Sequence, residues 1–121
     1  RAFCAWVRAR DAGLPCICCG ETAKSSSLTG GEWDAGHYRS RGAASHLRYD
    51  PRNCHAQRKQ CNRRAFDTAS YRANLIERIG LEAVKALEQD NRTHKWTRDE
   101  LREIRDTYRQ KLRELMKARR A

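Results

Sequence analysis

Long hydrophobic runs are absent from this sequence of 121 residues. No stretch approaches the roughly 20 apolar residues of a membrane-spanning helix, so we expect no membrane association. A cleavable signal sequence is also absent, and we therefore expect a cytoplasmic protein. The chain has no glycine-rich phosphate loop and no room for a doubly wound sheet, which excludes dehydrogenases, kinases and α/β-hydrolases. It begins at Arg1 without an initiator Met, so we expect a fragment of a longer protein.

Hydrophobic and acidic residues are both scarce. Only 39% of the residues are hydrophobic, so the core must be small, and a stabilising staple of some kind is plausible. Lys and Arg total 26 against 15 Asp and Glu, a net charge of +11. Residues 33–64 alone contribute +6 of this charge and three of the four His. Charge concentrated in this way favours nucleic acid as the partner, with a solvated basic face or anionic lipid as alternatives.

The arrangement of the six cysteines suggests a metal site. An even number in a short chain could also indicate disulfides, but the absence of a signal sequence argues against them. Cys16-x2-Cys19-Gly20 has the spacing of a zinc knuckle, in which Gly permits a tight turn and two thiolates converge on one ion. Structural zinc normally has four ligands, and Cys61 is the expected third. The residue three positions before Cys61 is Arg58, which cannot ligate a metal.

The first half of the chain is predicted to contain one helix and two extended segments. Residues 2–12 should form a short amphipathic helix. Residues 22–31 are a polar loop, residues 32–38 have the pattern of a strand, and residues 53–57 that of a second extended segment. Between these segments lies a basic loop with a turn signal at Asp50-Pro51.

From about Cys61 onward the chain is predicted to be helical, which gives an α+β, mainly helical fold. Gly80 should end one helix, and Thr97 with Glu100 forms a capping box that opens a long helix. Apolar residues at helical spacing mark a core or docking face of that helix: Leu101, Ile104, Tyr108, Leu112 and Leu115. Its outer face carries arginines that are either solvated or a second DNA-contact surface: Arg102, Arg105, Arg109 and Arg113.

The chemically informative residues lie between positions 33 and 62. His37 ends the first predicted strand, Asn53 begins the second extended segment, and Asn62 opens a helix. This order has the pattern of a ββα-metal unit. Hydrolysis of a phosphodiester needs a base to deprotonate water and a cation to neutralise charge on the phosphate. Histidine titrates near neutrality and suits the first role, and Mg²⁺ held by few protein oxygens suits the second.

This arrangement resembles the His-Asn-His (HNH) nucleases, and Asp34-x-Gly36-His37 is similar to an element of the non-specific ββα-metal nucleases. The resemblance implies that His37 is the general base, that Asn53 fixes the loop and orients the base, and that Asn62 is the metal ligand on the helix. Many members carry a metal-binding Asp directly before the His, where this chain has Gly36. Asp34 is three residues before the His, points to the opposite face of the strand, and is expected to brace the site.

Longer strings extend the resemblance over essentially the whole chain: LPCICCG, WDAGHYRSRGAA, LRYDPRNCHAQ, YRANLIERIGLEAV and HKWTRDELREI. These strings resemble the C-terminal part of the NinG (Rap) recombination proteins of lambdoid phages. The resemblance implies a structure-specific endonuclease that cleaves D-loops and Holliday junctions with Mg²⁺ or Mn²⁺ in the bacterial host. The family pattern places a Cys at position 58, so Arg58 leaves the zinc either with a substitute fourth ligand or lost.

We predict a nuclease core with the zinc knuckle in residues 1–66, and a helical region in residues 67–121 that packs on the core or mediates dimerisation. A homodimer through the long helix would supply one active site per strand of a junction. His55 is expected to be a second metal ligand or a phosphate contact. No small-molecule cofactor is expected. DNA contacts are expected from the basic residues of the core: Arg39, Arg41, Arg48, Arg52, Arg58, Lys59, Arg63 and Arg64.

Two other functions stay open. The departures at Gly36 and Arg58 would also suit a catalytically inactive zinc-knuckle protein that binds DNA as a recombination accessory. The long C-terminal helix would suit a structural adaptor that binds another protein.

Overall fold

The computed structural model describes residues 1–22, 33–64 and 68–120, and it shows a mainly helical α+β protein with one small sheet. This confirms the predicted fold class. Two short 3₁₀ helices, Ser45–Leu47 and Pro51–Asn53, lie between the strands. The helices and strands, in chain order, are α1 (Ala2–Arg10), β1 (Trp33–His37), β2 (Cys54–Arg58), α2 (Lys59–Arg64), α3 (Thr68–Ile79), α4 (Leu81–Gln89) and α5 (Arg98–Arg120).

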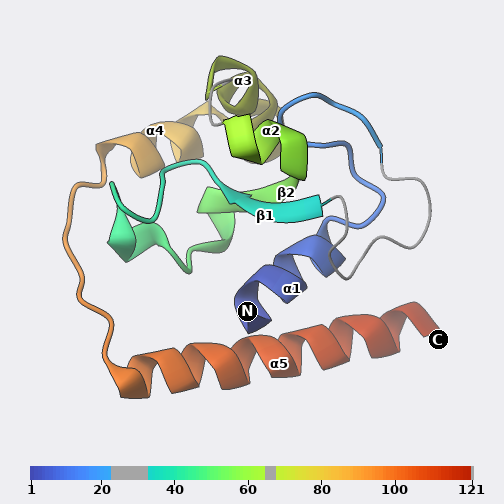
Figure 1. Ribbon diagram of the computed structural model, residues 1–121, viewed down its shortest axis with the longest axis vertical. Helices are drawn as coiled ribbons and strands as arrows, with labels where there is room; N and C mark the ends of the chain where they lie inside the picture. The colour runs from blue at the N-terminus through green and yellow to red at the C-terminus, as the bar shows by residue number, and fades with distance from the viewer. Residues whose placement is uncertain (23–32, 65–67, 121) are drawn as a thin grey trace.

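The sheet is an antiparallel pair that stands at the centre of the molecule (Figure 1). Trp33 is paired with Arg58 at one end, and His37 is paired with Cys54 at the other. Helices α2, α3 and α4 lie on one side of this pair, and α1 and α5 lie on the other (Figure 1). Because β2 continues directly into α2, two strands and a helix follow one another in the chain.

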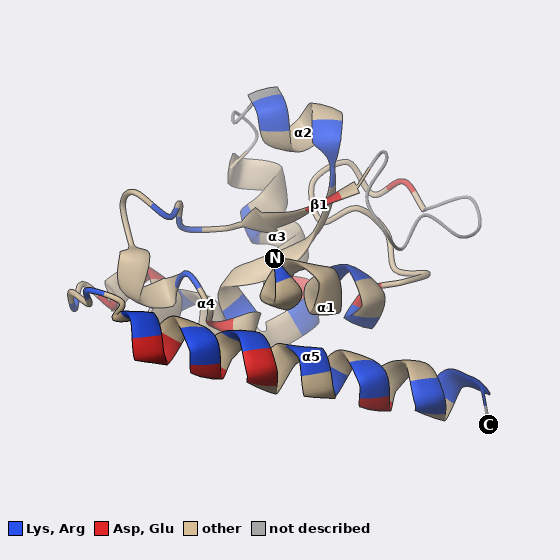
Figure 2. Ribbon diagram, turned by 60° about the horizontal axis from the view of Figure 1, so that its bottom comes forward, with Lys and Arg blue, Asp and Glu red and all other residues tan. Residues whose placement is uncertain are grey.

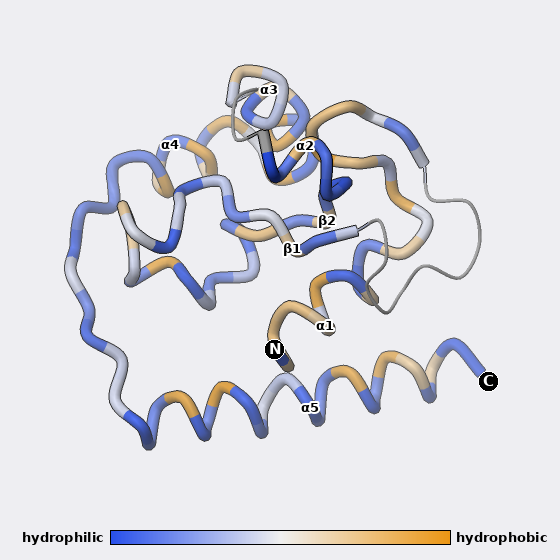
Figure 3. The backbone as a smooth tube through the Cα atoms, in the orientation of Figure 1, coloured by the Kyte–Doolittle hydropathy of each residue, from blue (hydrophilic) through white to orange (hydrophobic). Residues whose placement is uncertain are grey.

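The hydrophobic core is divided between the two sides of the sheet. On the side of α3 and α4, Tyr71, Leu75, Val84 and Leu87 are buried together. On the other side, Phe3 and Val7 of α1 pack with Cys54 of β2 and Tyr108 of α5. The rings of Phe3 and Tyr108 meet edge to face with their centroids 4.8 Å apart, which fixes α5 against α1. Figure 3 shows hydrophobic positions recurring along α5 between hydrophilic ones.

Element boundaries in the first half differ from the expectation by one or two residues. Helix α1 ends at Arg10 and not at residue 12, because Asp11 turns inward and its carboxylate accepts a hydrogen bond from the N–H of Ala56 at 2.8 Å. Strand β2 begins at Cys54 and not at Asn53, which ends a 3₁₀ helix capped by Asp50. Helix α2 begins at residue 59, two residues before Cys61, because no loop separates it from β2. The predicted polar loop 22–31 lies outside the described residues except for its first position.

The predicted signals of the second half are confirmed. Gly80 follows the last residue of α3 with a φ of 90°, a conformation that favours glycine. Thr97 and Glu100 form the capping box: each side chain accepts a hydrogen bond from the other's backbone N–H, at 3.0 and 3.1 Å. The predicted boundary between residues 66 and 67 lies outside the described residues. None of the described helices is both long enough and apolar enough to span a membrane.

Candidate functional site

His37 is the last residue of β1, and a single backbone contact fixes its ring. The Nε2 atom lies 2.9 Å from the carbonyl oxygen of Arg48, so Nε2 carries the hydrogen and donates it. The other ring nitrogen, Nδ1, then carries the lone pair and lies 4.0 Å from the sulfur of the buried Cys54 thiol, which can donate to it. Burial lowers the pKa of His37, the Arg48 carbonyl opposes this, and the positive charges of Arg41 and Arg48 lower the pKa further. The ring is therefore neutral at pH 7 and able to accept a proton.

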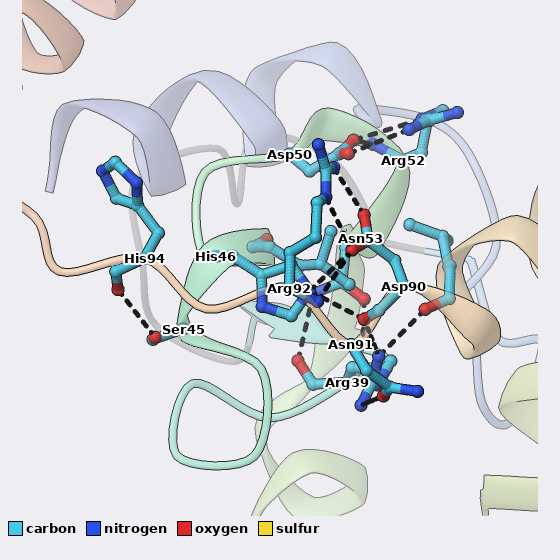
Figure 4. A network of polar contacts seen from close by, with 12 residues as sticks. Arg39, Ser45, His46, Asp50, Arg52, Asn53, Asp90, Asn91, Arg92 and His94 are labelled. Atoms are coloured by element: carbon cyan, nitrogen blue, oxygen red, sulfur yellow. Dashed lines mark hydrogen bonds and ion pairs between the residues drawn. The ribbon is translucent and has the colours of Figure 1, made fainter.

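Asn53 lies at the end of the loop that joins β1 and β2 and forms hydrogen bonds with other residues of that loop (Figure 4). Its side chain is fully buried, accepts a hydrogen bond from the N–H of Arg39 at 2.9 Å, and donates to the carbonyl oxygens of Arg39 at 3.0 Å and Leu47 at 3.3 Å. The N–H of Tyr38 also donates to the Asn53 carbonyl at 2.8 Å. These bonds hold both ends of the loop, and with them the Arg48 carbonyl that binds His37.

Asn62 projects from α2 and is hydrogen-bonded to Asp34. Its Nδ2 donates to Asp34 Oδ2 at 3.1 Å, and the ammonium group of Lys59 lies 3.7 Å from the other carboxylate oxygen. Asp34 and His37 are three positions apart on one strand, so their side chains leave opposite faces. The hydrogen bond holds Asn62 to Asp34 through its Nδ2 group, so the amide oxygen of Asn62 is the atom that could bind a metal ion.

A cleft of about 410 Å³ has both His37 and Asn62 in its lining. Gln57 and Tyr71 also line it, and the Tyr71 hydroxyl donates to the carbonyl oxygen of Gly36 at 2.6 Å. A Cβ atom at Gly36 would lie 1.9 Å from Gln57 Oε1, so a side chain at this position would require Gln57 to move. The Gln57 amide thus fills the space beside Gly36.

His55, in contrast, is not brought to this cleft. It is 4% exposed and packs edge to face on Tyr71 with the ring centroids 6.4 Å apart. Burial first, and the charge of Arg10 second, lower its pKa to about 4. Within the described residues, its Nδ1 atom is buried without a hydrogen-bond partner. His55 is thus a neutral core residue in this structure, and the prediction that it binds metal or phosphate has no geometric support here.

Several of the basic residues expected to contact DNA make intramolecular contacts instead. The guanidinium of Arg39 donates to the carbonyl oxygens of Leu87 at 3.1 Å and Asp90 at 2.6 Å (Figure 4). Three more of these basic residues pair with carboxylates: Arg52 with Asp50, Arg58 with Glu21 and Lys59 with Asp34. The charges of Arg52, Arg58 and Lys59 are thus partly compensated within the chain, although the side chain of Arg52 is still 55% exposed.

Three of the remaining members, Arg41, Arg48 and Arg63, form no ion pair among the described residues. Arg63 is exposed on α2, and Arg64 is the last residue of this helix. Arg41 and Arg48 line a second, larger groove of about 1020 Å³ between α1, the loop after β1 and α5, and His37 lines this groove as well. Arg105 and Arg109 of α5 also line it, so the expectation that both lie on the outer face of that helix is wrong.

The predicted zinc ligands are brought together by the structure. The sulfur atoms of Cys16, Cys19 and Cys61 all lie within 4.8 Å of one another, whereas Cys18 and Cys54 are not part of this group. Cys16 Sγ accepts hydrogen bonds from the N–H groups of Cys18 at 3.4 Å and Arg58 at 3.2 Å. Three converging thiols with N–H donors at the sulfur form a donor set that zinc accepts.

The fourth position of this group holds a charge pair. Arg58 Nη1 lies 2.6 Å from Glu21 Oε2, beside the thiols. Burial alone would raise the pKa of Cys19, but hydrogen bonds from the Glu21 N–H, from Cys16 and Cys61, and from Arg58 lower it. The lowered pKa of Cys19 favours its thiolate, which is the form that binds metal. Burial and the neighbouring thiols raise the pKa of Cys61, so without a metal ion this thiol stays protonated.

Arg10 and Asp11, which the sequence did not suggest as important residues, hold α1 to the two strands. Arg10 donates to the carbonyl oxygens of Pro51 at 2.9 Å and Cys54 at 2.7 Å, and its Nε donates to Asp11 at 2.7 Å. Burial would raise the pKa of Asp11, but the hydrogen bonds from Arg10 and from the N–H of Ala56 hold it below its usual value. Adjacent Arg and Asp at the end of a short helix would have been the only signal in the sequence.

Comparison with known proteins identifies relatives along nearly the whole chain. A family model described as "Bacteriophage Lambda NinG protein" matches residues 1–118. The chain is 45% identical to "Protein ninG" of Salmonella phage P22 and 43% identical to "Protein ninG" of Escherichia phage lambda, each over 120 residues and 98% of the chain. It spans 56% of the length of each of these relatives. No solved structure matches. The chain therefore belongs to the NinG family of lambdoid phage proteins.

Proposed function

We propose that this chain is a divalent-metal-dependent DNA endonuclease built on a ββα unit of the His-Asn-His type. The unit comprises β1, β2 and α2, with His37 at the end of the first strand and Asn62 on the helix. The observation that carries the proposal is the fixed tautomer of His37, whose Nε2–H is bound to the Arg48 carbonyl at 2.9 Å, in a residue that lines a cleft together with Asn62. A base held in this way is ready to activate water.

The chain's own residues supply the base and the positive charge of the reaction. His37 takes a proton from water at Nδ1, and the resulting hydroxide attacks the phosphorus. The bond from phosphorus to the 3′ oxygen breaks, and the departing oxygen receives a proton from solvent, which leaves a 5′-phosphate. Arg41 and Arg48 line the groove beside His37 and stabilise negative charge on the phosphate.

The donor set of the cleft fits a weakly held Mg²⁺ or Mn²⁺ ion. Asn62 Oδ1 would hold it, since the Nδ2 group of the same side chain is bound to Asp34. When bound, such an ion neutralises charge on the phosphate and keeps most of its own waters. Glycine at position 36 removes one carboxylate that relatives of this type use, so we expect weaker metal binding than in a site with two protein ligands.

The substrate we propose is branched DNA, such as D-loops and Holliday junctions, in the cytoplasm of the bacterial host. The resemblance to recombination proteins supports this choice, and so does the net charge of +11. The alternative is a DNA-binding accessory protein without catalysis. Gly36, with Gln57 beside it in place of a carboxylate, and Arg58 beside only three thiols are the observations that favour it.

The test compares cleavage of a labelled four-way junction and a linear duplex by the wild-type chain and by His37→Ala, with Mg²⁺, Mn²⁺ or EDTA. We expect metal-dependent cutting of the junction, and a loss of about 10² to 10⁴ in rate for His37→Ala, because a general base contributes about that much. His94→Ala is the matched control, since His94 is exposed and contacts Glu100 far from the cleft.

Binding of the junction, measured in EDTA, should be the same for the wild type, His37→Ala and the control. Tight binding without cutting under any metal would favour the accessory protein. Equal cutting of junction and duplex would support the endonuclease activity and contradict the preference for branched DNA.

A further inference from the structure

The groove between α1 and α5 has an unusual lining. Six arginines line it, and among the described residues no Asp or Glu does: Arg1, Arg8, Arg41, Arg48, Arg105 and Arg109. They come from three separate parts of the chain, namely α1, the loop after β1 and α5. Figure 2 shows α5 alongside α1 with Lys and Arg along its whole length. The fold therefore gathers onto one groove charges that are far apart in the sequence.

Most of the arginines that line the groove lack the carboxylate partners that several other arginines of the chain have. Across the described part of the chain, Arg8, Arg41, Arg48 and Arg109 form no ion pair, and Arg105 pairs only with its neighbour Asp106. Several arginines outside the groove are compensated by carboxylates, as in Arg52 with Asp50, Arg72 with Glu88 and Arg92 with Asp90. Others, among them Arg39 and Arg113, have no carboxylate partner among the described residues but bond to carbonyl or amide oxygens. The positive charge of the groove is therefore uncompensated within the folded chain, and an anionic partner would neutralise it.

His37 stands where this groove meets the smaller cleft that contains Asn62. It lines both depressions, one on the side of α2 and α3 and the other on the side of α1 and α5. Two separate paths for an extended anion thus leave the proposed reacting atom in different directions. A linear duplex that presents one phosphate to His37 and Asn62 would follow one of these paths and leave the other open.

We infer that the arginine groove binds the phosphate backbone of a second DNA segment, which diverges at His37 from the segment being cut. This inference rests on the proposed function and gives its branch preference a physical basis. The apolar side chains of Leu101 and Ile104 would lie against sugars, while the arginines bind phosphates. Arg105 and Arg109 are one helical turn apart, so both guanidinium groups can reach the same strand.

The experiment measures equilibrium binding in EDTA, so that cleavage plays no part. It compares the wild type with Arg105→Gln/Arg109→Gln, using a four-way junction and a linear duplex over a range of salt concentrations. The control is Arg102→Gln/Arg113→Gln, which removes the same charge from the same helix at residues that do not line the groove. Gln keeps a high helix propensity, and thermal unfolding followed by circular dichroism would show that α5 is retained.

We expect the groove variant to raise the Kd for the junction by about tenfold or more and to reduce the salt slope by about 2, because two phosphate contacts are lost. The duplex, and the control variant with either DNA, should change much less. Equal weakening by both variants, equal weakening for junction and duplex, or no weakening would each overturn the inference. If the wild type cuts no DNA with any metal, the proposed endonuclease fails, while these binding data still decide whether the groove holds a second segment.

Discussion

The two ends of the small sheet differ in what their side chains contact. At the thiol end, where Trp33 pairs with Arg58, Cys16, Cys19 and Cys61 converge on one another. At the histidine end, where His37 pairs with Cys54, the ring is fixed by a carbonyl from a loop, and its second nitrogen is directed away from that contact. At the thiol end three side chains contact one another, and at the histidine end the only polar side-chain contact of the ring among the described residues is the Cys54 thiol, which lies 4.0 Å from Nδ1.

Charge follows the same division. Arg58 at the thiol end is paired with Glu21 at 2.6 Å, whereas Arg41 and Arg48 near His37 pair with no carboxylate among the described residues. A compensated end can stabilise the fold, and an uncompensated end can bind an anion. One pair of five-residue strands therefore carries a cluster of thiols at one end and, under the proposed function, the base of the reaction at the other.

Helix α2 connects the two ends. Cys61 belongs to the thiol group, and the next residue, Asn62, lines the cleft with His37. Adjacent residues on a helix point about 100° apart, so the same turn of α2 serves both centres. Anything that displaces Cys61 should therefore displace Asn62 as well.

The largest expected effect is the removal of metal from the thiol end. We expect about one zinc ion per chain, measured by elemental analysis, and a fall in Tm of more than about 10 °C on chelation, because structural zinc contributes several kcal/mol. Cys61→Ser should lose the zinc and lower the Tm in the same way. Because α2 carries both residues, cleavage should fall together with zinc content.

Arg58→Cys is the matched variant for this prediction. It adds a fourth thiol where the strand already donates an N–H to Cys16 Sγ at 3.2 Å, so we expect zinc to bind at least about tenfold more tightly. The prediction would be wrong if the wild-type chain contained no zinc and chelators did not change its Tm. The three thiols would then pack together without a metal ion.

The features that could be predicted from the sequence are those whose signals lie within a few residues of one another. The capping box at Thr97, the stop at Gly80 and the knuckle spacing of Cys16 and Cys19 are signals within a few residues, and the structure confirms each geometry. The engagement of Arg39 with the end of α4, some 50 positions away, depends on how distant elements pack. No pattern around Arg39 distinguishes it from Arg41, which faces the groove.

The same limit applies to individual residues of the candidate site. His37, Asn53 and Asn62 could be identified because their spacing resembles a known motif. The position of the Gln57 side chain beside Gly36 could not be predicted, since it depends on the register of the two strands. The placement of Arg105 and Arg109 in the groove depends on which side of α5 packs on α1, and the apolar stripe alone does not decide that.

A smaller effect should follow from Asn53→Ala at the histidine end. The substitution leaves the N–H and carbonyl oxygen of Arg39 and the carbonyl oxygen of Leu47 without their buried partner. We expect the free energy of unfolding to fall by about 3 kcal/mol, measured by urea denaturation, because unsatisfied buried groups cost about 1–3 kcal/mol each. Zinc content should be unchanged, which would show that the two ends are stabilised independently.

Asn91→Ala is the control for this substitution. Asn91 is exposed and accepts one hydrogen bond from Arg39 at 3.3 Å, so we expect a loss below about 0.5 kcal/mol. If the two variants were equally stable, the loop would be held by its other contacts and not by Asn53.

The smallest effect concerns the pH dependence of stability, to which His55 and His37 both contribute. The pKa of His55 is about 4 in the folded chain against an ordinary value of 6.5, so the unfolded chain binds more protons between these values. Stability from this group is therefore complete above pH 6.5 and is lost as the pH falls. Between pH 8 and pH 5 we expect the loss of about 2 kcal/mol from His55, with a further loss in the same direction from His37.

His55→Phe keeps a ring against Tyr71 and removes the titrating group, so its unfolding free energy should decline less steeply below pH 6.5 than that of the wild type. His94→Phe, at an exposed position, should leave the slope unchanged. Urea denaturation at pH 8, 6 and 5 measures all three chains. An identical slope for His55→Phe and the wild type would place the acid sensitivity elsewhere. A reduced slope would show that the histidine end is stable only while both of its rings stay neutral, the state in which His37 can also act as a base.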